Sequence, residues 1–284
     1  MSLLPKNEPT EKDITPKVFF IWGQSMHGKT YLARQFPNPL IVNTDGNGKK
    51  TTTPHVDVFD FETFAKVINE IEEGKHDFET IIIDLVDDIK TMMDVFICDK
   101  AGVENLADIG FGKGFSAAKS TWKRLMIRLT QMPYTIIFIS HIVQRSDEND
   151  RDKMIELPSL EQQYLNMTKG RTDVMIKCQK VGKTYLQLCN EKRDSYKKED
   201  FKNKDVLKAV ENVKSLFEDN KPVIQTMSKI KSTPLIKKKG EVKEEVVEKA
   251  PIEKQEEVVI TVEKPTVKKT PVKKSLLIKK EEEK

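Results

Sequence analysis

The chain has 284 residues, 37% of them hydrophobic and 33% charged, which is enough for one sizeable core and further segments outside it. No run approaches the roughly 18 consecutive apolar residues that a membrane-spanning helix needs, and residues 1–17 lack the apolar centre of a signal peptide. Three scattered cysteines without a CxxC pair, and four histidines without ligand spacing, give no case for a disulfide framework or a zinc site. We therefore expect a cytoplasmic protein that has no membrane partner.

The net charge of +4 is located mostly at the C-terminal end of the chain. Residues 228–284 hold 16 Lys and 11 Glu, a surplus of +5 that leaves −1 for residues 1–227. The basic pI therefore gives no general argument for nucleic-acid binding. Because residues 228–284 have no aromatic side chain and are rich in Lys, Glu, Val and Pro, we predict a disordered tail. Its two Leu-Ile-Lys-Lys repeats are either part of a solvated segment or short motifs that dock on a partner.

Short apolar runs alternate with helical stretches between residues 18 and 190. Runs such as ETIIIDL and YTIIFIS are apolar throughout rather than alternating, as expected for parallel strands buried on both faces. This pattern predicts an α/β fold with a central, mostly parallel sheet, extended by a hairpin that turns at Val181 and Gly182. Strands are predicted at 18–22, 40–43, 56–59, 80–85 and 134–140. Helices are predicted at 29–36, 61–73, 86–100 and 116–131.

A glycine-bounded loop follows the first predicted strand. The segment GQSMHGKT matches the pattern GxxxxGK[ST], whose backbone N–H groups wrap phosphate oxygens, and it stands between a strand and a helix as the pattern requires. Lys29 is expected to reach the β- and γ-phosphates of ATP, and the Thr30 hydroxyl to ligate Mg²⁺. A second Gly-Lys-Thr at residues 182–184 is rejected because Lys177 stands where the first glycine should be. The predicted nucleotide-binding residues are Gly23, Gln24, Ser25, Met26, His27, Gly28, Lys29 and Thr30.

Polar residues stand at the ends of the other predicted strands. Asp84 ends the run ETIIID and is the expected Walker B aspartate, which holds Mg²⁺ together with Thr30. The next residue is leucine rather than the glutamate that AAA+ remodelling proteins and DExx helicases place there, so the acid that activates water must come from elsewhere. Asp45 and Glu62 are both candidates for this base, since each follows a strand end. His141, after the strand that ends at 140, stands where a γ-phosphate sensor is expected.

Together these residues resemble the core of RecA-type ATPases. The resemblance is closest to the small phage-borne RecA-like ATPases that accompany single-strand annealing and recombination. It covers about residues 17–200 and is carried by WGQSMHGKT, NTDGNG, IIIDLVDD, GFGKGFSAAKSTWKRLM and IIFISHIVQR. The resemblance implies a sheet in which the sensor strand lies between the phosphate-loop strand and the Walker B strand, with ATP bound between subunits.

The resemblance also implies roles for individual residues. Glu62 aligns best with the catalytic glutamate of RecA, because both open a helix after the third strand, and His141 falls at the polar sensor. The predicted catalytic residues are thus Lys29, Glu62, Asp84 and His141. Residues 144–170 fall where the mobile DNA-binding loops lie. The expected DNA contacts are Arg145, Arg151, Lys169 and Arg171, with Tyr164 for base stacking. The expected cations that complete a neighbouring subunit's site are Lys192 and Arg193.

The sequence therefore predicts an arm at 1–16, a RecA-like ATPase core at 17–200, a helical extension at 201–227 and the tail at 228–284. The leading interpretation is a homo-oligomeric, DNA-stimulated ATPase that uses ATP and Mg²⁺ and acts on single-stranded DNA in recombination, annealing or replication. Its compartment would be the host cytoplasm if the chain is viral. The alternative is a nucleotide-gated adaptor that recruits a single-strand-binding or recombination protein through its charged tail.

Overall fold

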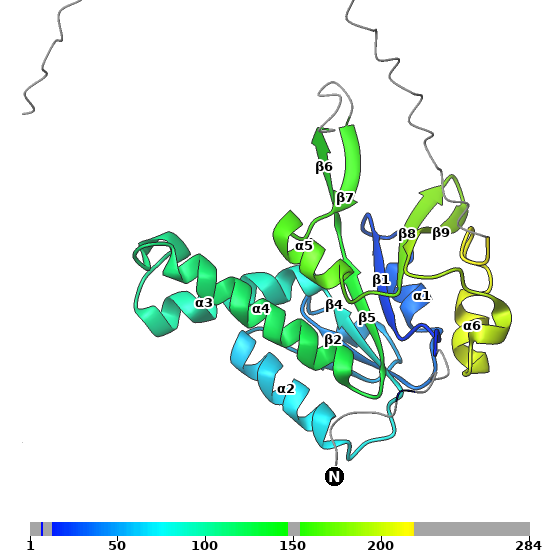
Figure 1. The fold of residues 1–284 in the computed structure, drawn as a ribbon, viewed down its shortest axis with the longest axis horizontal. Helices are drawn as coiled ribbons and strands as arrows, with labels where there is room; N and C mark the ends of the chain where they lie inside the picture. The colour runs from blue at the N-terminus through cyan, green and yellow to red at the C-terminus, as the bar shows by residue number, and fades with distance from the viewer. Residues whose placement is uncertain (1–6, 8–12, 147–153, 219–284) are drawn as a thin grey trace, which may run out of the picture. The chain divides into compact units, whose positions relative to one another are not determined.

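The computed structural model describes residue 7 and residues 13–146 and 154–218 of the chain (Figure 1). The predicted tail, most of the predicted N-terminal arm and the predicted DNA contact Arg151 lie outside the described residues. Within the described part of the chain, no helix is long and apolar enough to cross a membrane.

A seven-stranded sheet forms the centre of the fold, in the order β3-β2-β4-β5-β1-β8-β9 (Figure 1). All neighbouring strands pair in parallel except β8 and β9, which are antiparallel. The predicted α/β fold is therefore confirmed, and β5 lies between β1 and β4 as the resemblance implied. The strands are β1 (Val18–Gly23), β2 (Pro39–Asn43), β3 (His55–Asp57), β4 (Thr80–Asp84), β5 (Thr135–Ser140), β8 (Val174–Val181) and β9 (Thr184–Lys192).

Helices cover both faces of this sheet (Figure 1). The helices are α1 (Lys29–Ala33), α2 (Phe61–Glu73), α3 (Val86–Ala101), α4 (Lys113–Gln131), α5 (Gln162–Lys169) and α6 (Lys204–Val210). Two predicted strands, 56–59 and 80–85, end early because the chain turns into a helix. Asp60 caps α2 by accepting a hydrogen bond from the Thr63 N–H, and Leu85 stands at the N-cap of α3.

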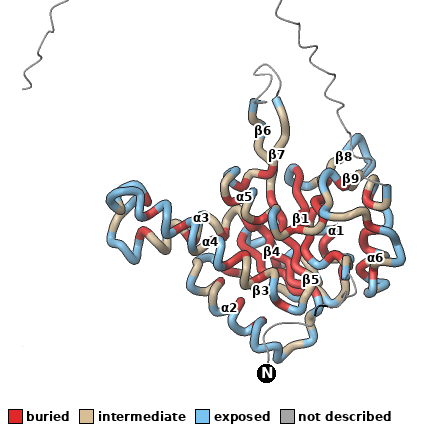
Figure 2. Tube along the Cα trace, viewed as in Figure 1, coloured by how far each residue is buried: buried red, intermediate tan, exposed pale blue. Residues whose placement is uncertain are grey.

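The side chains of β1 show why its sequence is apolar throughout. Phe20 and Trp22 belong to the hydrophobic core formed with α2, α3, α4 and α5. Phe19 and Ile21 belong to a second core, formed with α1 and α6 on the other face of the sheet. Figure 2 shows the buried residues concentrated along these central strands. Because Val210 and Leu216 are buried in the second core, the segment after residue 200 packs on the same sheet.

A separate antiparallel hairpin, β6 (Ile142–Ser146) with β7 (Met154–Pro158), extends beyond the end of β5 (Figure 1). The interpretation of 144–170 as mobile loop is therefore wrong in its described parts, which are this hairpin and α5. The polar composition of residues 144–170 gave no sign of the apolar side chains that hold the hairpin and α5 in place. Ile155 and Leu157 are partly buried in the hairpin, and Tyr164 and Leu165 anchor α5 in the core.

Candidate nucleotide-binding site

The loop at residues 23–30 joins β1 to α1, at the carboxyl end of a central strand. Gly23 has a φ of 155° and lies so close to β8 that an added Cβ would stand 2.3 Å from the Cys178 carbonyl oxygen. Gly28 stands at the N-cap of α1 in the left-handed conformation, with a φ of 85°. Both positions need glycine, which is the role that the phosphate-loop pattern gives to its two glycines.

Lys29 is folded back onto this loop. Its Nζ donates to the carbonyl oxygens of Gly23 (2.9 Å) and Gln24 (3.0 Å) and lies 3.2 Å from Nδ1 of His141. Burial lowers the pKa of Lys29, and nearby carboxylates, Asp84 foremost, oppose that shift. A buried ammonium that rests on neutral oxygens can be drawn to a phosphate, which offers it a full negative charge.

Thr30 and Asp84 form the next part of the site. The Thr30 hydroxyl donates to Asp84 Oδ2 at 2.7 Å, so the end of β4 is joined to the start of α1. Burial raises the pKa of Asp84 to about 6, although this hydrogen bond works against the rise. A cation placed beside this buried carboxylate would stabilise its ionised form and lower the raised pKa.

The ends of β2 and β4 are held together by Thr44. Its N–H donates to the Asp84 carbonyl oxygen at 2.8 Å, its hydroxyl oxygen accepts from the Leu85 N–H at 2.8 Å, and its hydroxyl donates to Asp88 Oδ2 at 2.6 Å. The next residue, Asp45, is exposed, and its carboxylate accepts from the N–H of Asn47 (2.8 Å) and from Asn47 Nδ2 (2.7 Å). After burial, the charge of Asp45 is the largest of the effects that raise the pKa of Asp84.

Asp87 is the hydrogen-bonding centre behind the site. Its carboxylate accepts from the Ser140 hydroxyl (2.8 Å), the His141 N–H (2.9 Å) and the Ser159 hydroxyl (2.6 Å). Burial raises the pKa of Asp87, and these hydrogen bonds oppose the rise. For His141, burial and the charge of Lys29 lower the pKa, which favours a neutral ring facing the lysine.

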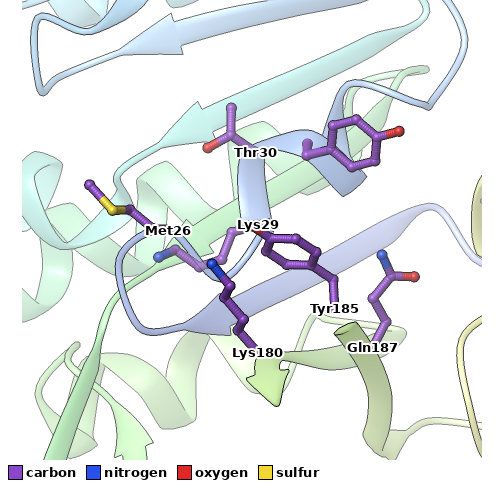
Figure 3. Close-up of a pocket in the computed structure, with 8 residues that line it drawn as sticks. Met26, Lys29, Thr30, Lys180, Tyr185 and Gln187 are labelled. Atoms are coloured by element: carbon purple, nitrogen blue, oxygen red, sulfur yellow. The ribbon is translucent and has the colours of Figure 1, made fainter. Parts of the chain in front are cut away.

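A cavity of about 790 Å³ adjoins the loop on the side of the β8–β9 hairpin. Figure 3 shows Lys180, Tyr185 and Gln187 of the hairpin grouped beside Lys29. The Tyr185 ring lies against Gly28, 3.3 Å from the place of an added Cβ, and Lys180 Nζ lies 5.2 Å from the ring centroid. This size and aromatic lining suit the base and ribose of a nucleotide whose phosphates enter the loop. Met26, Thr30 and Tyr31 complete the lining.

Thr30 and Asp84 fit a Mg²⁺ ion. Both offer hard oxygen ligands, and Mg²⁺ is commonly held by one or two protein oxygens together with substrate phosphates and water. Among the described residues, no group of three or more His, Cys, Asp or Glu side chains could hold a metal ion by itself. A metal at this place would therefore take its remaining ligands from nucleotide and water.

Glu62 is not brought to these residues. Its side chain is 57% exposed, pairs with Lys100 at 3.2 Å, and lines a separate cavity with Phe59 and Phe96. Glu62 follows β3, the edge strand, whereas Asp45 follows β2, which pairs directly with β4. The geometry therefore favours Asp45 over Glu62 as the acid beside the phosphates.

Those predicted DNA contacts that the structure describes do not form one surface. The prediction that Tyr164 stacks on bases is wrong, because the ring is 1% exposed and packs edge-on against Trp122. Arg145 lies on β6, beyond the carboxyl end of the sheet. Lys169 pairs with Glu191 at 2.6 Å, and Arg171 lines a cavity at the opposite edge of the sheet, where β1 begins.

The two predicted trans-acting cations have partners within the chain. Lys192 donates to the carbonyl oxygen of Leu216 at 2.9 Å, and also contacts that of Glu218. Arg193 pairs with Asp173 at 3.2 Å and donates to the Gly170 carbonyl oxygen at 2.8 Å. A role in a neighbouring subunit's site stays a prediction for both residues.

Asp84→Asn should stabilise the protein at pH 8 while lowering turnover about 100-fold or more. A raised carboxyl pKa means that stability falls as pH rises from about 4 through about 6. The amide removes this cost, on the order of 2–3 kcal/mol, and can still accept from Thr30. Thermal melts should show a gain of several degrees at pH 8 that disappears near pH 4. A lower melting temperature at pH 8 would contradict this account.

Several site residues escaped the sequence analysis. Asp87 and Asp88 stand in the quoted run IIIDLVDD, but only the helical turn after β4 shows that they face β5 and β2. Tyr185 directly follows the rejected second Gly-Lys-Thr, and the parallel pairing of β1 with β8 brings its hairpin to the loop. Thr44 stands in the quoted run NTDGNG, but that run assigned it no role. The sequence offered one sign of this cluster: three aspartates, at 84, 87 and 88, lie within five residues at the end of a strand.

Comparisons with known proteins agree with this geometry. A family model described as an AAA domain matches residues 15–215. A curated relative, the SPbeta prophage-derived uncharacterized protein YorG of Bacillus subtilis (strain 168), is 25% identical over 147 residues. The alignment covers 49% of this chain and 45% of the relative, so the chain spans less than half the length of that protein.

Proposed function

Because the chain belongs to the AAA domain family, which is of nucleotide-binding ATPase type, we propose that it is a RecA-type ATPase. It hydrolyses ATP with Mg²⁺ and acts on single-stranded DNA in recombination, annealing or replication. The RecA type is supported by the place of β5 between β1 and β4 and by the absence of glutamate after Asp84. The prophage origin of the relative supports a viral setting.

One observation carries the proposal. Four side chains from three separate segments converge at the carboxyl edge of the sheet: Thr30 on Asp84 at 2.7 Å, and Lys29 beside His141 at 3.2 Å. Sites for ligands form at this edge of parallel sheets. Two are buried charged groups, Lys29 and Asp84. Among the described residues neither has a partner of full opposite charge in hydrogen-bond contact, and a magnesium–triphosphate would supply the missing charges to both.

The residues divide the work of hydrolysis among them. The loop amides and Lys29 would hold the β- and γ-phosphates, and Thr30 and Asp84 would hold Mg²⁺, whose charge would stabilise negative charge on the phosphate oxygens. Asp45 orients the attacking water and receives its proton. His141, whose Nδ1 lies 3.2 Å from Lys29 Nζ, would contact a γ-phosphate bound to that lysine and so distinguish a triphosphate from a diphosphate.

The exposed face of α4 is the surface that fits single-stranded DNA. This helix carries five cations and no acid, and only Arg128 has an ion pair, with Glu72, among the described residues. Lys119 and Lys123 stand one turn apart on the exposed face. The other exposed cations of the helix are Lys113 and Arg124. A row of unpaired cations on one helix face is an electrostatic footprint for a phosphate backbone.

Two aromatic side chains extend the same face. Phe115 is 46% exposed and stands one turn before Lys119, and Phe111, just before the helix, is fully exposed. Binding sites for single strands combine cations that follow the backbone with aromatic rings on which bases stack. The row Phe115, Lys119, Lys123 spans about 12 Å along the helix, which places both features within reach of one short segment of DNA.

The deciding measurement is steady-state ATP hydrolysis with and without single-stranded DNA. We expect stimulation by DNA, and in the Lys119→Glu/Lys123→Glu variant a loss of that stimulation with basal turnover unchanged. The salt dependence of binding should weaken by about 0.7 in log–log slope for each lysine. Lys204→Glu/Lys208→Glu on α6 makes the same charge change on exposed lysines and should leave DNA stimulation intact.

Two outcomes would contradict the proposal in different ways. Hydrolysis without DNA stimulation, together with no salt-dependent DNA binding, would reject the DNA role and favour the nucleotide-gated adaptor. Normal stimulation in the α4 variant would keep the function but reject this surface.

A further inference from the structure

Lys180 is a second lysine beside the phosphate loop. It comes from β8 and lines the same cavity as Lys29 and Gly28 (Figure 3). The ion pairs formed among the described residues do not include Lys180. Its ammonium lies instead over the Tyr185 ring, 5.2 Å from the centroid. The cavity therefore contains a positive charge that forms no ion pair within the described part of the chain.

The register of β8 against β1 explains where Lys180 points. Gly23, the last residue of β1, pairs with Cys178, and β8 continues beyond this pair alongside the loop. Alternate residues of a strand face the same side of the sheet. Cys178 belongs to the core that α1 covers, so Lys180 projects on the face of α1. Lys177 projects on the other face, where its ammonium lies over the Trp22 ring.

The facing strand, β9, holds this lysine at the loop. Tyr185 stands directly opposite Lys180 in the antiparallel pair, so the two side chains share a face. The Tyr185 ring lies against Gly28, 3.3 Å from the place of an added Cβ. A cation over an exposed ring is held weakly, whereas a hydrogen bond from an ammonium to a phosphate oxygen joins two full charges and is stronger. A phosphate within reach would therefore take the ammonium from the ring.

Lys180 and Lys29 lie on opposite sides of the phosphate loop. The strand before the loop, β1, has β5 on one side and β8 on the other. Lys29 is turned toward the end of β5, where its Nζ lies 3.2 Å from Nδ1 of His141, whereas Lys180 stands on β8. A nucleotide with its terminal phosphates in the loop and its base beside Tyr185 would therefore bring its α- and β-phosphates past Lys180.

We propose that Lys180 binds the α- and β-phosphates of the nucleotide, as a cation supplied by the same chain that supplies the loop. This assignment rests on the proposed nucleotide binding and adds a residue to that site. The cations expected from a neighbouring subunit, Lys192 and Arg193, each have partners within their own chain, whereas the described partner of Lys180 is an aromatic ring. Because ADP and ATP share these two phosphates, Lys180 strengthens the binding of both to a similar degree.

Calorimetric titrations of the full chain with three ligands test the assignment. The ligands are ADP, a non-hydrolysable ATP analogue and inorganic tripolyphosphate, each with Mg²⁺. Lys180→Gln should bind all three about 5- to 10-fold more weakly, since the lost contact is to phosphate and is partly screened by solvent. Lys180→Arg should restore most of the affinity. In steady-state hydrolysis by Lys180→Gln, KM should rise by a similar factor and kcat fall by less than about 3-fold, because the contact is the same in the ground state and the transition state.

Lys183→Gln is the matched control for these titrations. Lys183 is exposed in the turn of the same hairpin and does not line the cavity, so its variant should bind all three ligands as the unaltered chain does. A loss confined to the two nucleotides would place the Lys180 ammonium at the base or ribose and overturn the assignment. Unchanged affinities in Lys180→Gln, equal losses in the two glutamine variants, or failure of tripolyphosphate to bind the unaltered chain would overturn it too. If the unaltered chain binds neither nucleotide, the proposed function falls as well.

Discussion

ATP turnover should fall by about 10²–10³-fold in the Lys29→Ala variant. Lys29 is the buried cation of the loop, and its Nζ lies within 3.2 Å of the carbonyl oxygens of Gly23 and Gln24 and of Nδ1 of His141. Removing a positive charge that stabilises the phosphate oxygens in the transition state lowers the rate by a factor of this size. Steady-state phosphate release measures the loss, and circular dichroism verifies that the variant folds.

Lys183→Ala is the matched control for this variant. Lys183 also stands between glycine and threonine, but Gly182 forms the turn between β8 and β9 and no phosphate loop surrounds it. Its replacement should leave turnover within about 2-fold, since exposed surface lysines contribute little. Equal losses in the two variants would show that the loop at residues 23–30 is not the site of hydrolysis.

Asp45→Asn should lower turnover by about 10²–10⁴-fold, whereas Glu62→Gln should retain most activity. Thr44 binds the end of β2 to β4, and the charge of the next residue, Asp45, acts on Asp84 and raises its pKa. Glu62 is instead turned toward Lys100 on α3. Nucleotide affinity should be nearly unchanged in the asparagine variant, because the amide removes proton acceptance and not phosphate contacts. A large loss in Glu62→Gln with normal turnover in Asp45→Asn would restore the assignment that the resemblance implied.

The sheet and the phosphate loop could be predicted because they depend on short-range rules. Apolar runs such as ETIIID predict strands that are buried on both faces. Two glycines followed by Lys29 and Thr30 predict a phosphate loop, whose backbone conformation is nearly constant among proteins that have it. The position of β5 came from the resemblance alone, because no local pattern states which strands become neighbours. The sequence also identified Asp84, since a strand end and a buried carboxylate coincide there.

The remaining site residues depend on contacts between distant segments. Strand order decides which acid lies nearer to Asp84. Asp84 ends β4, and β2 is a neighbour of β4 in the sheet whereas β3 is not. The spacing of residues along the chain does not reveal this order. Tyr164 illustrates the opposite error. An aromatic residue among polar neighbours suggested a base-stacking platform, but its ring fills the space beside Trp122 in the core. Long-range packing thus overruled local composition at both places.

The place of β1 in the sheet has a consequence for the order in which the protein can be assembled during synthesis. Its two neighbours are β5 and β8, which begin at Thr135 and Val174, far later in the chain. At roughly 5–20 residues per second, a ribosome needs about 6–24 s after making β1 to complete β5. During that interval the apolar face of β1 has no strand to pair with. The loop at residues 23–30 therefore reaches its final surroundings only after β5 and β8 have been made, and until then the apolar side chains of β1 are open to association with other chains.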